Sequence, residues 1–189
     1  MIYTPTQKQF LLAVARQSIR HYLDMNARLT IDAKDVPEEL RQKRATFVTL
    51  TSNHRLRGCI GHLEAIQPLY QDVIDNAASA AFEDMRFPSL SESEFDFISI
   101  EISILSKPEP LDYKDANDLL SKLRPNVDGV IIREGRQSAT FLPQVWEELK
   151  SSESFLSHLC AKARLDPETW KEGDLDVSTY QVESFEEER

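Results

Sequence analysis

Two glycines flank a cysteine in the segment Arg57–Gly61, and an arginine precedes that cysteine by two residues. The chain of 189 residues has only five glycines and two cysteines, so this segment combines two scarce residue types. In an extended strand side chains alternate, and Arg57 and Cys59 then share one face. A guanidinium beside a thiol favours the thiolate, which is the nucleophilic form. The sequence therefore predicts that Cys59 is an accessible, reactive thiol and that Arg57 activates it.

The glycines beside this thiol admit two interpretations. Gly58 and Gly61 lack side chains and leave room for a ligand to approach the backbone, which makes them candidate ligand-binding residues. The alternative is a β-bulge or tight strand end in which Cys59 is a small core residue, because free cysteines are usually buried and inert. The other cysteine, Cys160, falls four residues after Leu156 on the apolar face of a predicted helix. We therefore expect Cys160 to be the buried and less reactive thiol.

Glu101 is a further candidate catalytic residue. It lies in the middle of a predicted strand over residues 97–105, in which isoleucines alternate with polar residues. Because alternate residues point to opposite faces, the isoleucines define a buried face and Glu101 lies on the other. Its carboxylate is a candidate general base, or it holds Arg57 or Arg86 in position. A solvated strand face explains Glu101 equally well.

Two other segments supply candidate ligand-binding residues. Asp84 and Arg86 follow an alanine-rich helix, and they either clamp a substrate or pair with each other to fix the helix exit. Gln144 stands near the start of a predicted helix, where free N–H groups suit an anion or a carbonyl oxygen. We predict that these three residues border one concave surface together with Arg57 and Cys59.

The spacing of cysteine and histidine argues against a metal site. Cys59 and His62 form one closely spaced pair, and His158 with Cys160 would have to supply the remaining ligands of a zinc ion. His158 and Cys160 are two residues apart on a predicted helix and so face different directions. A nucleophilic pair of Cys59 with His54 or His62 stays open. Strand alternation places His62 on the face opposite Cys59 unless Gly61 allows a bulge. We predict neither a metal nor a cofactor.

The composition is that of an acidic globular protein, with 41% hydrophobic and 29% charged residues. The formal net charge of −10 disfavours binding to a phosphate backbone, so nucleic acid is not an expected partner. No apolar run approaches the roughly 20 residues that a membrane span needs. The N-terminal residues lack the basic region and apolar stretch of a signal peptide, so we expect a cytoplasmic protein with free thiols.

Hydrophobic periodicity and turn residues predict an α+β fold. Thr4 and Pro5 form a start signal for the first helix, and β-branched runs separated by short turns predict two hairpins. The expected helices span 5–27, 68–82, 115–123, 143–150 and 152–163, and the expected strands span 45–51, 56–60, 97–105, 129–133, 138–142 and 176–185. Strands joined by hairpins, with helices before and after them, indicate a mainly antiparallel β-sheet with flanking helices.

Four segments of the chain resemble the AMMECR-type domain family, whose prokaryotic members are protein A of the AmmeMemoRadiSam set. They are Leu56–Gly61, Ala80–Pro88, Ile100–Leu111 and Thr140–Glu147. The resemblance covers nearly the whole chain, so residues 1–189 are expected to form a single AMMECR-type domain. It implies a larger part built from both chain ends and a smaller sheet subdomain. Family members typically have prolines where this chain has Met85 and Ser89, which makes that loop less stiff here.

The resemblance implies no reaction, because the family has no settled biochemical activity. Its prokaryotic companions, a Memo-like protein and a radical-SAM protein, are the partners that it suggests. Two classes of function stay open. One is a Cys-dependent enzyme that acts on a small molecule through Arg57–Gly61. The other is a non-catalytic module that binds a small anion or a partner protein at the same surface.

Overall fold

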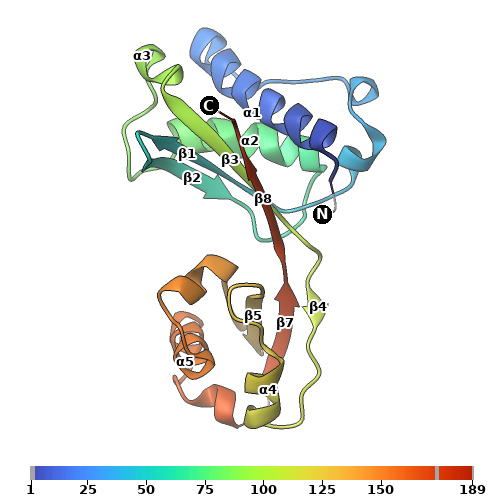
Figure 1. Cartoon of the computed structure of the whole chain (residues 1–189), viewed down its shortest axis with the longest axis vertical. Coiled ribbons are helices and arrows are strands. Elements are labelled where there is room, and N and C mark those ends of the chain that lie inside the picture. Colours follow the sequence, from blue (N-terminus) through green and yellow to red (C-terminus); the bar gives the residue numbers. More distant parts are fainter. Residues whose placement is uncertain (1–2, 173–174, 189) are drawn as a thin grey trace. The chain divides into compact units, whose positions relative to one another are not determined.

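A computed structural model describes residues 3–172 and 175–188 of the chain (Figure 1). The chain forms two compact units, one from residues 1–105 and 183–189 and the other from residues 106–182. Each unit combines helices with a four-stranded antiparallel sheet, which confirms the predicted α+β class. Among the described residues, no helix is both long enough and apolar enough to cross a membrane.

The first helix, α1 (Pro5–Met25), begins where the sequence predicts. The Thr4 hydroxyl accepts the backbone N–H of Gln7, and the Gln7 side chain accepts the N–H of Thr4. This reciprocal pair satisfies two donors that the first helical turn leaves free. Asn26 follows the helix in the left-handed conformation, with a φ of 51°, so the last helical residue, Met25, lies two residues before the predicted end at residue 27.

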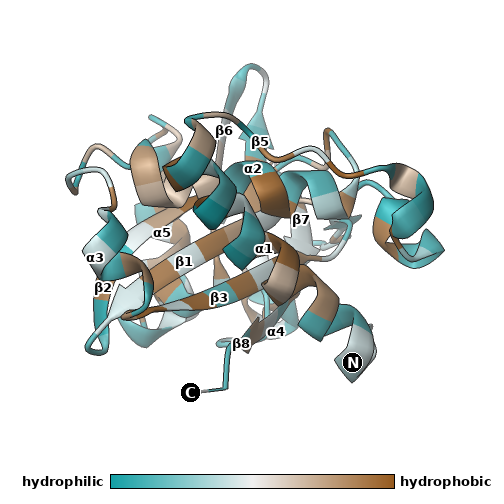
Figure 2. Ribbon diagram, turned by 90° about the horizontal axis from the view of Figure 1, so that it is seen from above, coloured by the Kyte–Doolittle hydropathy of each residue, from teal (hydrophilic) through white to brown (hydrophobic). Residues whose placement is uncertain are grey.

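The first unit is built on a sheet with strand order β2-β1-β3-β8. These strands are β1 (Thr46–Ser52), β2 (Arg55–Gly61), β3 (Ile98–Leu105) and β8 (Val182–Glu186). Helices α1 and α2 (Leu69–Phe82) cover one face of this sheet. Hydrophobic and hydrophilic segments alternate along β3 (Figure 2). The isoleucines of β3 form the predicted buried face and pack with both helices in one apolar core.

Short elements connect the parts of this first unit. The 3₁₀ helices η1 (Ala33–Asp35) and η2 (Glu38–Arg41) lie between α1 and β1. A short helix, α3 (Glu92–Phe95), lies between α2 and β3 and begins with a capping box formed by Ser91 and Glu94.

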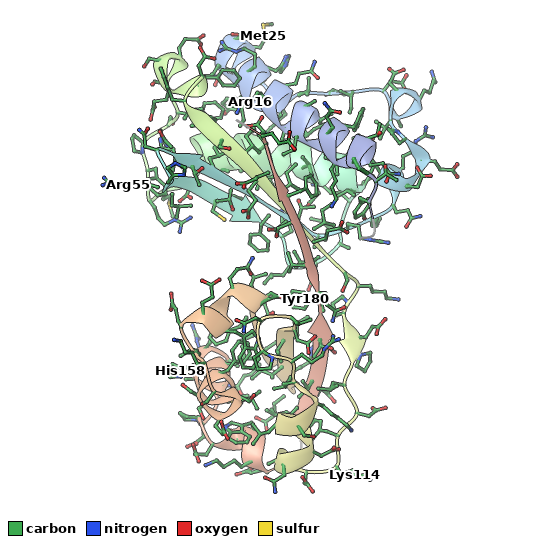
Figure 3. The ribbon with its side chains drawn as sticks, viewed as in Figure 1. Arg16, Met25, Arg55, Lys114, His158 and Tyr180 are labelled. Atoms are coloured by element: carbon green, nitrogen blue, oxygen red, sulfur yellow. The ribbon has the colours of Figure 1, made fainter. Side chains whose placement is uncertain are left out.

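The second unit has a sheet of strand order β4-β7-β5-β6. Its strands are β4 (Glu109–Pro110), β5 (Gly129–Glu134), β6 (Gln137–Phe141) and β7 (Asp176–Tyr180), and its helical elements are α4 (Ala116–Lys122), η3 (Pro143–Glu147), α5 (Ser152–Lys162) and η4 (Thr169–Lys171). Trp146 stacks on Phe155 in its core, with ring centroids 3.7 Å apart. Tyr180, at the end of β7 and labelled in Figure 3, is buried as well. Burial raises its pKa to about 12.

Two predicted elements differ from the structure. The strand expected over 176–185 is two strands, β7 and β8, which lie in different sheets. The chain changes sheets at Gln181, whose carbonyl accepts the N–H of Ser106 and whose own N–H donates to the Ser106 hydroxyl. The helix expected over 143–150 is the shorter 3₁₀ helix η3. Local periodicity missed the division of the strand because long-range pairing decides where a strand ends.

Candidate functional site

Cys59 lies on β2, an edge strand of the first sheet, and its side chain points away from the two helices. The neighbouring residue Gly58 defines the helix side, because a Cβ there would lie 2.1 Å from the carbonyl oxygen of Ala80 in α2. Alternation then places Cys59 on the face that α1 and α2 leave uncovered. The cysteine is half-buried, and its sulfur accepts a hydrogen bond from Thr49 Oγ1 on β1 at 3.3 Å.

Close packing accounts for both glycines beside this thiol. A Cβ at Gly58 would overlap the Ala80 backbone, and a Cβ at Gly61 would lie 2.4 Å from the Phe47 ring. Distances below 3.0 Å are unavailable to a real Cβ unless the neighbouring atoms move. The expectation that these glycines leave open space is therefore corrected: helix α2 and the Phe47 side chain fill it. Direct ligand binding at either glycine stays a prediction.

Asp84 and Arg86 hold the outward-facing peptide groups of Cys59. The backbone N–H of Cys59 donates to Asp84 Oδ2 at 2.9 Å, and Arg86 Nη2 donates to the Cys59 carbonyl at 3.2 Å. Arg86 also donates twice to the Asp84 carboxylate, at 2.9 and 2.7 Å. This hydrogen bonding from Arg86, with the N–H of Cys59, holds the pKa of Asp84 well below its usual range. Asp84 and Arg86 thus occupy the free backbone N–H and carbonyl of Cys59 at the outer edge of β2, and we call this pair the Asp84–Arg86 clamp.

Arg57 has a different role from the predicted one. The register shifts between Leu50 and Thr51, so Arg57 is the extra residue of a β-bulge. Its guanidinium donates to both carboxylate oxygens of Glu94, at 2.8 and 3.2 Å, and to the carbonyl of Pro88. The ion pair, together with the N–H of Ser91, lowers the pKa of Glu94 to about 2. This corrects the expectation that Arg57 activates the thiol, since among the described residues no contact joins the guanidinium to the sulfur.

Glu101 shares a row with the thiol across three strands. On β1, Thr49 is the register partner both of Cys59 on β2 and of Glu101 on β3. Paired residues of adjacent strands point to the same face, so Cys59, Thr49 and Glu101 form a polar row on the face without helices. Adjacent strands lie about 4.8 Å apart, which puts Cys59 and Glu101 roughly 10 Å from each other at the backbone. Thr49 was not predicted from the sequence, because no local motif marks a threonine as the residue between two strands.

The environment of Glu101 favours its neutral form. Burial raises the pKa of the Glu101 carboxyl, and repulsion from Glu186 on β8 adds to the rise. The Ser103 hydroxyl, 3.5 Å from Glu101 Oε1, donates a long hydrogen bond that opposes the rise in pKa only weakly. Glu101 holds neither Arg57 nor Arg86, as Glu94 and Asp84 pair with those arginines. A carboxyl with a raised pKa near a thiol is suited to acid–base chemistry.

Gln144 belongs to the second unit. It is an exposed residue of η3, whose Trp146 is a core residue that donates its indole N–H to the Asp128 carbonyl. Because Gln144 and Cys59 are in different units, their predicted presence at one surface stays a prediction.

His62 and Cys160 both lie in surroundings separate from those of Cys59. His62 Nδ1 lies 2.6 Å from Asp72 Oδ1 on α2. The His62 side chain is therefore on the helix side of the sheet, opposite Cys59, as strand alternation predicts. Cys160 is fully buried in the core of the second unit, and burial raises the pKa of its thiol. Within the described part of the chain, no group of three or more histidine, cysteine, aspartate or glutamate side chains is arranged to hold a metal ion.

Comparisons with known proteins agree with the resemblance of the four segments. The family model described as AMMECR1 matches residues 12–185. A protein of Thermofilum pendens is 38% identical over 94% of this chain and 88% of its own length, and one of Methanothermobacter thermautotrophicus is 37% identical over the full length of both. The crystal structure of an uncharacterised protein from Pyrococcus horikoshii matches all of this chain and 95% of that chain, with a TM-score of 0.85 and 34% identity. The chain belongs to the AMMECR1 family.

Proposed function

We propose that the polar row formed by Cys59, Thr49 and Glu101 is the site of a Cys-dependent reaction on a small molecule. The observation that carries this proposal is the register of β2, β1 and β3, which lines the three side chains up on the face without helices. The sulfur is the nucleophile, and the Thr49 hydroxyl at 3.3 Å donates to it and stabilises its negative charge.

Glu101 acts on the substrate rather than on the sulfur. The backbone separation of roughly 10 Å is too long for a direct contact, so the proposal places the small molecule between the Cys59 and Glu101 side chains, over Thr49. A carboxyl whose pKa is raised by burial gives and takes protons closer to neutrality than an ordinary glutamate does. The Asp84–Arg86 clamp fixes the Cys59 peptide and so fixes the direction of the thiol.

The test is turnover of a simple thiol-reactive acyl donor, phenyl thioacetate, by the full chain. Attack by the Cys59 sulfur on the carbonyl carbon releases thiophenol, and water then hydrolyses the acetylated cysteine to acetate and free thiol. We expect Cys59→Ser to abolish release of thiophenol above background, and Glu101→Gln to slow the hydrolysis by about 100-fold without slowing acetylation as much. Acetylation of Cys59 and Cys160 at equal rates would contradict the proposal. Mass spectrometry of the two cysteine peptides identifies the acetylated residue.

The alternative is a non-catalytic module that binds a small anion or a partner protein at the same surface. One observation favours it: the Arg86 side chain is 57% exposed and Met85 beside it is fully exposed. The Arg86 guanidinium beside the apolar Met85 side chain suits a partner protein that presents acidic and apolar side chains together. The Memo-like and radical-SAM companions of the family are the first candidates. In this alternative Arg86→Ala abolishes binding and Cys59→Ser leaves it unchanged, which is the reverse of the enzymatic outcome.

A further inference from the structure

A second set of polar residues lies at the end of β2, on the side of the sheet that the helices cover. His62 follows the last residue of β2, and its Nδ1 lies 2.6 Å from Oδ1 of Asp72 in α2. Asp72 is completely buried, whereas the His62 side chain is 39% exposed. A buried carboxylate thus holds an imidazole that is partly exposed to solvent.

The hydrogen bonds around Asp72 decide which nitrogen of His62 carries the proton. Asp72 Oδ2 accepts from the backbone N–H of Thr46 at 2.9 Å, from the Thr46 hydroxyl at 2.7 Å and from Asn76 Nδ2 at 2.9 Å. Oδ1 accepts from Gln67 Nε2 at 3.1 Å. A carboxyl surrounded by donors is an acceptor at both oxygens, so Nδ1 of His62 is the donor between these two residues. In neutral His62 the lone pair is then on Nε2.

The surroundings of His62 indicate which substrates it accepts. Leu63 and Ile66, in the loop that follows it, are 43% and 54% exposed. The nearby carboxylates of Asp72 and Asp75 both accept hydrogen bonds from Gln67, and within the described residues neither carboxylate forms an ion pair with an arginine or lysine. Arg28 donates instead to the backbone carbonyl of Asp75, at 2.7 Å. Negative charge beside the imidazole disfavours anions, and the exposed aliphatic side chains favour apolar groups.

We propose that His62 and Asp72 form a second catalytic dyad, in which Nε2 of His62 acts as a general base toward neutral acyl compounds such as esters. Nε2 takes a proton from a water molecule while the water oxygen bonds to the acyl carbon. The bond from that carbon to the alcohol oxygen then breaks, and the imidazolium returns the proton to the departing alkoxide. The products are a carboxylic acid and an alcohol, and Asp72 stabilises the imidazolium between the two steps.

This dyad is independent of the thiol site. The Cys59 sulfur contacts Thr49 on the face without helices, whereas His62 contacts α2. His158 offers a matched control because its Nδ1 also has an acceptor, the carbonyl of Ser154 at 2.8 Å, but that acceptor is neutral. A histidine held by a carboxylate should be the stronger catalyst of the two.

The experiment follows hydrolysis of p-nitrophenyl acetate by the full chain with the substitution Cys59→Ser, which removes the thiol that this activated ester would also acetylate. The histidine variants are made in that same background. We expect His62→Gln to lower the steady-state rate by about 100-fold and His158→Gln to change it less than about twofold. Because Asp72→Asn disturbs a buried network and risks unfolding, the second variant is His62→Ala. Its rate should recover when free imidazole is added, after the rate of imidazole without protein is subtracted. A merely structural histidine would not be rescued by imidazole, since the fold would not return.

Three results would overturn the dyad. One is a rate for the Cys59→Ser chain, with His62 intact, no higher than that of free imidazole at equal concentration. Another is a loss in His62→Gln no larger than that in His158→Gln. The third is turnover of p-nitrophenyl phosphate as fast as that of the acetate, because an anionic substrate contradicts the charge around His62.

Discussion

The two cysteines of the chain occupy opposite environments. Cys59 is half-buried on an edge strand, where Thr49 donates to its sulfur and side chains clamp its peptide on both sides. Cys160 is fully buried on α5 among apolar side chains, and burial raises the pKa of its thiol. The reactivity of a thiol in this fold therefore depends on the polar groups arranged around it, because burial among apolar side chains alone keeps a thiol protonated.

Gly58→Ala is expected to have the largest effect on the region around Cys59. The new Cβ would meet the backbone of Ala80, which cannot rotate away as a side chain would, so we expect the free energy of unfolding to fall by about 3 kcal/mol. Urea denaturation measures this change. The matched control is Gly135→Ala, where nothing lies within 4 Å and only the φ of 58° opposes the substitution. Equal losses in the two variants would mean that close packing on α2 does not explain Gly58.

Asp84→Asn tests the clamp and should have a smaller effect. Asparagine keeps an acceptor for the Cys59 N–H but loses the charge that pairs with Arg86, so we expect a loss of about 1.5 kcal/mol at pH 7. Because the folded-state pKa of Asp84 is depressed, the stability that its charge provides is present above the ordinary value near 3.9. The stability advantage of the wild type over Asp84→Asn should therefore shrink steadily as the pH falls from the ordinary pKa toward the depressed one. Urea denaturation from pH 7 to pH 2 gives the profile, and a difference independent of pH would contradict it.

Glu101→Gln should have the smallest effect and the opposite sign. Burial and Glu186 raise the pKa of Glu101, so the folded chain holds its proton more tightly than the unfolded chain. The contribution of Glu101 to the free energy of unfolding is therefore highest below the ordinary pKa of a glutamate, and it decreases as the pH rises through the raised pKa. At pH 8 we expect Glu101→Gln to be more stable than the wild type by about 0.5 kcal/mol, and at pH 3 to be equal to it. Thermal unfolding at both pH values checks the sign of this stability difference. A Glu101→Gln variant less stable than the wild type at pH 8 would show that the folded protein stabilises the Glu101 carboxylate.

The sequence predicted most elements of both units and part of the site. The alternating isoleucines of β3, the Thr4 cap of α1 and the Asp84–Arg86 pair are local patterns, and each is found where local rules place it. The position of Thr49 between Cys59 and Glu101 depends on strand register, which a single sequence does not specify.

The partner of Arg57 was missed for a related reason. Its predicted effect on Cys59 assumed regular alternation, and the bulge at Arg57 breaks that alternation. The acceptor, Glu94, is 37 residues away in the chain, so no spacing rule connects the two. The role of Gly58 was missed likewise, because close approach of α2 is a tertiary contact.

The most direct test of the contrast between the thiols is competitive alkylation of the native chain with iodoacetamide. Mass spectrometry of the two cysteine peptides gives each labelling rate across pH 6 to 9. We expect Cys59 to be labelled at least about tenfold faster than Cys160 throughout, and Thr49→Val to slow labelling of Cys59 without changing that of Cys160. Labelling of both thiols at equal rates, or faster labelling of Cys160, would contradict a reactive thiol in the polar row.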